Sequence, residues 1–288
     1  MMQKKVQIIS DGSLDLSQEL TKEKDIEVVP FYVSFDSETY QKEMVEVGVR
    51  EFYQEMVDHP TVFPKTSMPS VHDYYEVFEK HAKEQLPVIC ICITRKFSGS
   101  LQSATTAKDM ILEEYPDAQI TVIDSTVNTV LQGLYVLEAC RLRDMGLEYQ
   151  QIVDALLPIR ETGRIFFTIG SIDYLKHGGR IGRLAGIAAS ALKIKPVMGS
   201  TDEGAICQLD QARGITKGLA RMCELATRRA GKPEEKRAVI AHVNCPERAL
   251  QVKAELEKRG NYREIVITGA AGVATVYAGD GGIVLAVG

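Results

Sequence analysis

The sequence has no excess of positive charge and no long apolar run. Its 34 Lys and Arg residues stand against 39 Asp and Glu, a formal net charge of −5, whereas nucleic-acid-binding proteins carry basic surfaces that neutralise phosphates. The longest apolar stretches, such as 86–93, run for about eight residues, far below the roughly 20 of a membrane-spanning helix. The N-terminus also lacks the apolar core of a secretory signal. We therefore expect a cytoplasmic protein that binds no nucleic acid and does not insert stably into membranes.

Common catalytic and metal-binding signatures are absent as well. None of the six cysteines belongs to a Cys-x-x-Cys pair, and the five histidines form no His-Glu-x-x-His string, so a zinc site is not expected. A Walker A loop and a Gly-x-Ser-x-Gly motif are both missing. The glycine-rich run 279–282 precedes an expected strand instead of opening a helix, which argues against dinucleotide binding. We therefore predict no metal, no cofactor and no catalytic residues.

The residues that are present predict a large core. Hydrophobic residues make up 45% of the chain and charged residues 25%, which is typical of a globular protein. In the first half, short β-branched runs alternate with longer helical patterns, as in a mainly parallel sheet covered by helices. The expected strands are 6–10, 28–35, 88–94 and 120–124, and the expected helices are 13–22, 49–57, 71–85, 100–114 and 130–145.

The pattern changes near residue 162. After an expected helix at 149–160, the strands become shorter and hairpin-compatible links appear, such as 202–204. We therefore predict an α/β protein of two domains, residues 1–162 and 163–288, the second with a mixed sheet. The expected strands of the second domain are 165–169, 196–199, 205–209, 238–243, 265–268 and 283–287, and its expected helices are 184–192, 215–229 and 246–259.

Three turns are rich in hydroxyl groups. They are 11–13, 65–70 and 98–100, and they contain Ser13, Thr66, Ser67 and Ser98. A serine in such a turn commonly caps the next helix, and capping suffices to explain any one of them. Loops that follow parallel strands meet at one edge of the sheet, where ligands of α/β proteins bind. The coincidence of three such turns favours a site for an anion or a carboxylate.

Basic residues in the second half could supply a positive charge for that anion. Lys193, Lys195 and Arg213 flank expected strands, and the segment 174–183 surrounds a Gly-Gly turn with Lys176, His177, Arg180 and Arg183. Most such clusters are solvated surface. The following segment, 184–192, is rich in small residues, which permit close helix packing or leave room for an inserted chain.

Taken in order, these motifs resemble those of the DegV family over the whole chain. Each match is weak alone, whereas seven collinear matches are specific. The matching segments are 10–16 (SDGSLDL), 66–70 (TSMPS), 97–104 (FSGSLQSA), 122–125 (VIDS), 132–133 (QG), 175–181 (LKHGGRI) and 194–197 (IKPV).

The resemblance implies two α/β domains with a long-chain fatty acid, of the palmitate, stearate or oleate class, buried between them. Family members of this type present the acid to a separate ATP-dependent fatty acid kinase, so the resemblance implies a carrier for phospholipid metabolism that is not itself an enzyme. Carried over to matching positions, Thr66, Ser98 and Arg213 bind the carboxylate, and Ser67 and Ser125 are further candidates.

One position departs from the family. Aligning 279–281 with the family's Gly-Pro-Gly places Tyr277 where DegV proteins usually have a histidine. A phenol can donate one hydrogen bond to a carboxylate but cannot become cationic. Two alternatives to the kinase-linked carrier therefore stay open: a lipid sensor without a kinase partner, and an enzyme that acts on a small anionic substrate. For the carrier, we expect the kinase to dock at Lys176, Arg180 and Arg183.

Overall fold

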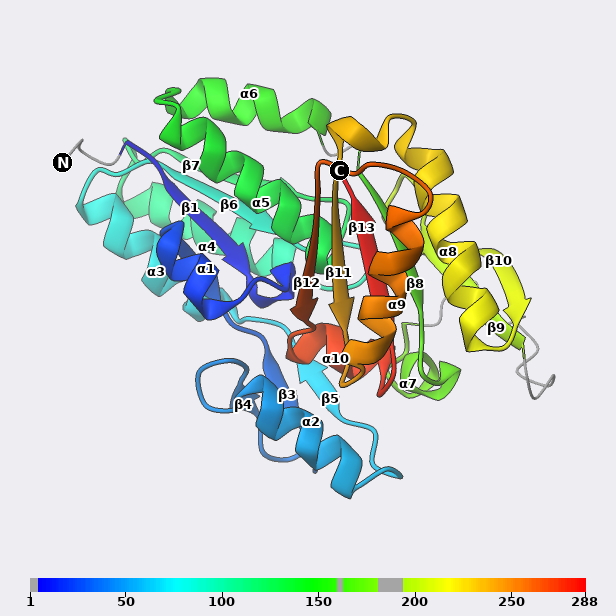
Figure 1. Ribbon diagram of the computed structural model, residues 1–288. Coiled ribbons are helices and arrows are strands. Elements are labelled where there is room, and N and C mark those ends of the chain that lie inside the picture. Colours follow the sequence, from blue (N-terminus) through cyan, green and yellow to red (C-terminus); the bar gives the residue numbers. More distant parts are fainter. Residues whose placement is uncertain (1–4, 160–162, 181–193) are drawn as a thin grey trace.

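Three β-sheets organise the chain, which the computed structural model describes for residues 5–159, 163–180 and 194–288 (Figure 1). The first half contributes a four-stranded sheet in the order β2-β1-β6-β7 and a three-stranded sheet in the order β4-β3-β5. The second half contributes a six-stranded sheet in the order β10-β9-β8-β13-β11-β12. The predicted α/β architecture, with one parallel and one mixed sheet, is confirmed.

The four-stranded sheet is parallel throughout. Helices pack on both of its faces, and every residue of β1 and β6 is therefore buried. Because the strands run in one direction, their carboxyl ends lie along one edge. The strands are β1 (Gln7–Asp11), β2 (Ile26–Val29), β6 (Val88–Cys92) and β7 (Ile120–Asp124), with α3 (Val71–Lys83) and α4 (Ser100–Glu114) on one face and α5 (Thr129–Asp144) and α6 (Tyr149–Ile159) on the other.

The single strand expected at 28–35 is wrong. Pro30 interrupts it, because proline has no N–H to donate to a sheet, and the chain continues into a different sheet. There β3 (Tyr32–Ser34) pairs antiparallel with β4 (Gln41–Lys42) and β5 (Lys65–Ser67). Helix α2 (Val49–Asp58) packs on this small sheet. Residues 65–67, expected in a turn, thus form a strand.

The helix expected at 13–22 is also wrong as one element. A 3₁₀ turn, η1 (Gly12–Leu14), ends at Asp15, whose φ of 49° is left-handed. A separate helix, α1 (Gln18–Glu23), then begins after Ser17, whose side chain accepts a hydrogen bond from the Leu20 N–H. In this conformation the side chain of Asp15 points into the protein interior, where the residue is 1% exposed.

The six-stranded sheet is mixed. Only β11 and β12 are parallel, and the other described pairings are antiparallel. Helices α8 (Ile215–Ala230) and α9 (Pro246–Glu257) cover one face. The expected helix 184–192 lies outside the described residues. The strands are β8 (Arg164–Thr168), β9 (Ile194–Ser200), β10 (Ile206–Arg213), β11 (Arg237–His242), β12 (Glu264–Gly269) and β13 (Ile283–Val287), and the remaining short helices are α7 (Ile172–His177), η3 (Pro233–Glu235) and α10 (Gly272–Ala278).

The two halves meet around the beginning of α5 and around α10 (Figure 1). Val130 and Leu131 of α5 share a buried cluster with Ile165 and Val284 of the mixed sheet. Tyr53 of α2 donates a hydrogen bond of 2.6 Å to the carbonyl oxygen of Ala270. The domain boundary near residue 162 stays a prediction. None of the described helices is both long and apolar enough to span a bilayer.

Candidate functional site

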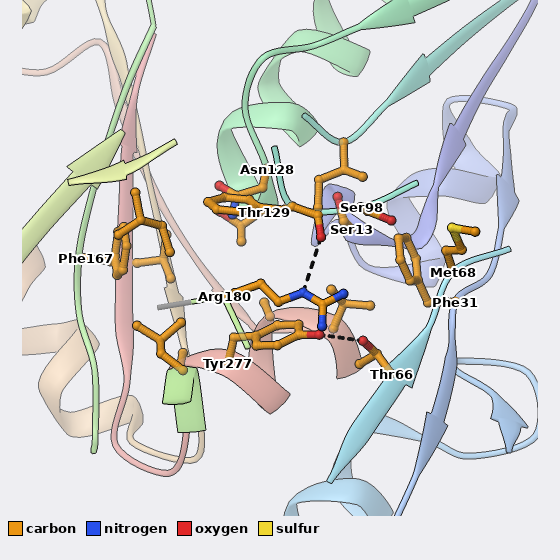
Figure 2. A pocket seen from close by; sticks show the side chains of 18 of the residues that line it. Ser13, Phe31, Thr66, Met68, Ser98, Asn128, Thr129, Phe167, Arg180 and Tyr277 are labelled. Carbon is orange, nitrogen blue, oxygen red and sulfur yellow. Dashed lines mark hydrogen bonds between the residues drawn. The ribbon is translucent and has the colours of Figure 1, made fainter. Parts of the chain in front are cut away.

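A cavity of about 290 Å³ lies at the junction of the two halves. The mixed sheet contributes one wall through Ile165, Phe167 and Val284, and α10 contributes another through Ala274 and Tyr277. The remaining walls come from the first half, from the turns after β1 and β6, the strand β5 and the start of α5. Figure 2 shows these side chains converging from both halves.

The three hydroxyl-rich turns contribute to this one cavity. Ser13, Thr66, Ser67 and Ser98 all line it, and the reason is partly the parallel sheet, whose carboxyl-terminal edge carries the turns after β1 and β6. Strand β5 brings Thr66 and Ser67 to the same place by pairing with β3.

Asp11 ties these turns together. Its Oδ2 accepts hydrogen bonds from the Ile93 N–H at 2.9 Å and the Ser100 hydroxyl at 2.8 Å. Its Oδ1 accepts from the Gln132 side chain at 2.8 Å and from the Ser13 N–H at 3.3 Å. Burial raises the pKa of Asp11 even though these four donors oppose the shift. The ends of β1 and β6 are thereby joined to the starts of α4 and α5.

One end of the cavity is polar. The Thr66 and Tyr277 hydroxyl groups lie 2.7 Å apart, one from each half. The Arg180 guanidinium group lies 5.4 Å from the centre of the Tyr277 ring, and its Nε donates to the carbonyl oxygen of Phe97 at 3.3 Å. Figure 2 shows Arg180 between Ser98 and Tyr277. The Ser98 oxygen accepts from the Ser100 N–H at 3.1 Å, so its own O–H remains available as a donor.

The rest of the lining is mostly apolar. It includes Phe31, Ile93, Phe167, Leu175, Val273 and Val284. An apolar cavity with a few converging polar groups at one place is the usual form of a small-molecule site. The geometry suits a molecule with an anionic head and an apolar body.

The whole chain matches known proteins. The family model described as "Uncharacterised protein, DegV family" matches residues 5–287. The chain belongs to the DegV family. A structure of a stearic acid-binding protein from Eubacterium ventriosum is 37% identical, with a TM-score of 0.89 and coverage of 98% of this chain and 97% of that one. A DegV family structure from Ruminococcus gnavus with vaccenic acid is 30% identical, with a TM-score of 0.88 and coverage of 99% and 100%.

A curated relative gives the same result from sequence alone. The DegV domain-containing protein from Halalkalibacterium halodurans is 31% identical over 280 residues, which cover 97% of this chain and 96% of the relative. The predicted family resemblance is therefore confirmed, and the fold is that of the DegV structures.

Four of the carboxylate residues predicted for this DegV protein lie together. Thr66, Ser67, Ser98 and Tyr277 all line the cavity. Ser125 does not: its hydroxyl donates to the carbonyl oxygen of Val127 at 3.0 Å and closes the turn after β7. The Ser125 side chain is fully buried in that turn.

Arg213 needs a correction, because the structure does not bring it to the cavity. It is the last residue of β10, at the opposite end of the strand from Ile206, which does line the cavity. It lines a separate recess together with Lys195 and Arg248. Arg180 instead supplies the cation at the cavity.

The predicted docking residues also differ in their placement. Lys176 is exposed on α7 and pairs with Asp173 at 3.4 Å. Arg180 faces the cavity, so it is not simply a surface residue. Arg183 lies outside the described residues.

Sequence reasoning named Arg180 among several possible cations but could not tell which of them faces the site. It missed the roles of Asp15 and Glu43. Asp15 lies in the matching segment 10–16, but only the fold shows that Asp15 and Glu43 are 1% and 2% exposed and bonded to α10. Within residues 5–159, 163–180 and 194–288, no group of three or more His, Cys, Asp or Glu residues is arranged to hold a metal.

Proposed function

We propose that this DegV protein binds a long-chain fatty acid in the cavity between its two halves. The observation that carries the proposal is the polar end formed by Thr66, Tyr277 and Arg180 beside an otherwise apolar lining. At about 0.8 kcal/mol per buried methylene, a 16-carbon chain contributes on the order of 12 kcal/mol before the costs of binding. The stearic acid-binding protein that is 37% identical over nearly the whole chain supports the proposal.

The polar end then orients the carboxylate. A carboxylate is costly to bury without partners, and the hydroxyl groups of Thr66, Ser98 and Tyr277 are donors of suitable size. Ser67 lies beside them. Arg180, whose side chain lines the same end of the cavity, provides a guanidinium group with several N–H donors, which the hydroxyl groups lack.

Extraction of the purified protein tests this function. Transfer into organic solvent followed by mass spectrometry should yield about one fatty acid per chain, in the palmitate, stearate or oleate class. Delipidated protein should bind added palmitate or oleate at the same stoichiometry. Absence of both an extracted acid and binding of an added one would refute fatty acid binding.

We further propose that the bound carboxylate is presented to a separate ATP-dependent fatty acid kinase. The absence of a Walker A loop from the sequence agrees with this division of labour. The exposed Lys176 on α7, close in sequence to Arg180, is the described residue best placed to contact an acidic kinase surface. Lys176→Glu should lower the kinase turnover of bound acid without changing its binding, whereas Lys258→Glu, at the residue that follows α9, should change neither. Unchanged turnover in Lys176→Glu would remove this docking site.

Tyr277 supports a second candidate, a lipid sensor without a kinase. Its phenol binds Thr66 directly but cannot become cationic, unlike the imidazole usual in the family. The Tyr277→His variant and the wild type, each loaded with fatty acid and incubated with a fatty acid kinase and ATP, distinguish the sensor from the carrier. A gain of acyl phosphate formation in the variant alone favours the sensor, and equal formation by both proteins favours the carrier.

A further inference from the structure

Two acidic side chains from the first half bind the beginning of α10, which belongs to the second half. The Ala271 N–H donates to Oδ1 of Asp15 at 2.7 Å. The Val273 N–H donates to Oε2 of Glu43 at 3.0 Å, while Oε1 of Glu43 accepts from the Phe31 N–H at 3.3 Å. The first N–H groups of a helix have no partner within it, and no side chain of the helix itself caps α10. Residues from the other half do so instead.

The contact is tightly built. A Cβ atom on Gly272 would come within 2.7 Å of Oε2 of Glu43, and one on Gly12 would collide with Oε1. Glycine at both positions lets the carboxyl group enter between η1 and α10. The Glu43 backbone N–H also donates to the carbonyl oxygen of Phe31 at 2.9 Å. This hydrogen bond fixes the backbone from which the Glu43 side chain reaches α10.

The capped helix carries the polar end of the cavity. Val273 and Tyr277 are four residues apart and thus lie on one face of α10, about 6 Å along its axis. Both line the cavity. Only about one helical turn separates the N-terminus of α10 from Tyr277. A shift of that N-terminus would therefore move the Tyr277 phenol relative to Thr66.

We propose that Asp15 and Glu43 are positioning residues for the fatty acid site, which hold α10 so that Tyr277 meets Thr66 and the carboxylate of the ligand. This inference rests on the proposed function and extends it to two residues that do not line the cavity. Neither residue contacts the ligand; each acts through the backbone of α10.

The surroundings of Glu43 are acidic. Asp11 lies at the end of β1 and Asp15 directly after η1. Repulsion from Asp11 raises the pKa of Glu43, and repulsion from Glu43 raises the pKa of Asp15. The neighbouring Lys42 is engaged elsewhere, in an ion pair of 3.1 Å with Asp73. None of the described residues forms an ion pair with Asp11, Asp15 or Glu43.

Other titratable or charged groups also lie near α10. The Arg180 guanidinium group lies 5.4 Å from the centre of the Tyr277 ring on α10, and Tyr53 reaches Ala270 from α2. His242, at the end of β11, has its pKa lowered by burial. Burial, together with repulsion from Asp11, raises the pKa of Glu43 to about 8.

Hydrogen exchange and ligand binding test the positioning role. In Glu43→Ala and Asp15→Ala, the peptide 272–278 of the ligand-free protein should exchange about fivefold to tenfold faster, as expected for a lost helix cap. Affinity for dodecanoate, measured below its micelle concentration, should fall by a similar factor. Glu43→Gln keeps one acceptor oxygen and should recover part of both losses, and it carries the test if Glu43→Ala does not fold.

Glu27→Ala is the matched control. Glu27 is a partly buried carboxylate near the beginning of β2 that accepts a 2.6 Å hydrogen bond from His81. Its loss should lower stability without changing exchange of 272–278 or dodecanoate affinity. Wild-type exchange and affinity in Glu43→Ala and Asp15→Ala would overturn the proposal, as would equal losses in Glu27→Ala.

A pH profile gives a readout that general destabilisation would not move. Ionisation of Glu43 between pH 7 and 9 adds a negative charge near the ligand head, so wild-type affinity for dodecanoate should fall about threefold or more. Affinity for the neutral dodecanol should stay constant, and Glu43→Gln should flatten the dodecanoate profile. An unchanged profile in Glu43→Gln would count against the proposal. If the wild type bound no acid at all, the proposed function would fail, while the exchange comparison would still decide whether these residues hold α10.

Discussion

Removal of the Tyr277 hydroxyl group probes the polar end of the cavity most directly. In the ligand-free protein this hydroxyl is already bonded to Thr66 at 2.7 Å, so ligand binding exchanges one hydrogen bond for another. A neutral hydrogen bond contributes about 0.5–1.5 kcal/mol and one to a charged group about 1.5–3 kcal/mol. The difference, about 1–1.5 kcal/mol, corresponds to a loss of affinity of about fivefold to twelvefold in Tyr277→Phe.

The assay compares two ligands that differ only in the head group. Dissociation constants of dodecanoate and of its methyl ester are measured by isothermal titration calorimetry for the wild type, Tyr277→Phe and Thr66→Val. The loss in Tyr277→Phe should apply to the acid and be at most about twofold for the ester, because an ester is a weaker, uncharged acceptor. Equal losses for both ligands, or no loss for the acid, would refute the placement of the carboxylate beside Tyr277.

Three further predictions concern charge, volume and pH. Arg180→Met should weaken dodecanoate binding about fivefold at low salt and less at 1 M salt, where charges are screened; a loss independent of salt would contradict it. Ala274→Phe, which extends a side chain into the cavity from α10, should weaken octadecanoate more than dodecanoate in the same titrations. Glu43 has a pKa of about 8 in the folded protein against a reference value of 4.5, so its contribution to stability is present below pH 4.5 and is lost as the pH rises to about 8. Urea unfolding should therefore show a weaker decline of stability over this range in Glu43→Gln, and an unchanged slope would contradict the assignment.

Local patterns were enough to predict most of the elements. The helix at 100–114 and the strands at 120–124 and 283–287 have the predicted bounds, because each is long or apolar enough for periodicity to decide its type. The turns 11–13 and 98–100 could also be predicted to lie near one another, since loops of a parallel sheet share an edge. Thr66 and Ser67 join them for a reason the rule does not cover, the antiparallel pairing of β5 with β3.

Elements with weak local signals were missed. Helix α10 contains glycine, threonine and valine, which are poor helix formers, and its N-terminus is stabilised from 230 or more residues away by Glu43 and Asp15. The split at Pro30 was visible in the sequence, but the antiparallel pairing of β3 with β5 depends on residues that lie about 30 positions apart.

The exchange of Arg213 for Arg180 shows where sequence reasoning ends. Both arginines stand in motif-like segments, and their charges are equal. Ile206, the first residue of β10, lines the cavity, whereas Arg213, the last residue of the same strand, lies in a separate recess. The turn after α7 brings Arg180 over the Tyr277 ring.

The sequence by itself determined the α/β architecture, the family and the residue types of the polar end, because these depend on periodicity and on short motifs. The tertiary structure decided which of those residues share a cavity, which cation faces them, and that Asp15 and Glu43 hold α10 from the other half. The physical reason is that hydrogen bonds and desolvation act between atoms in space: a carboxyl group is an ordinary solvated residue until the fold buries it against the N–H groups of a distant helix.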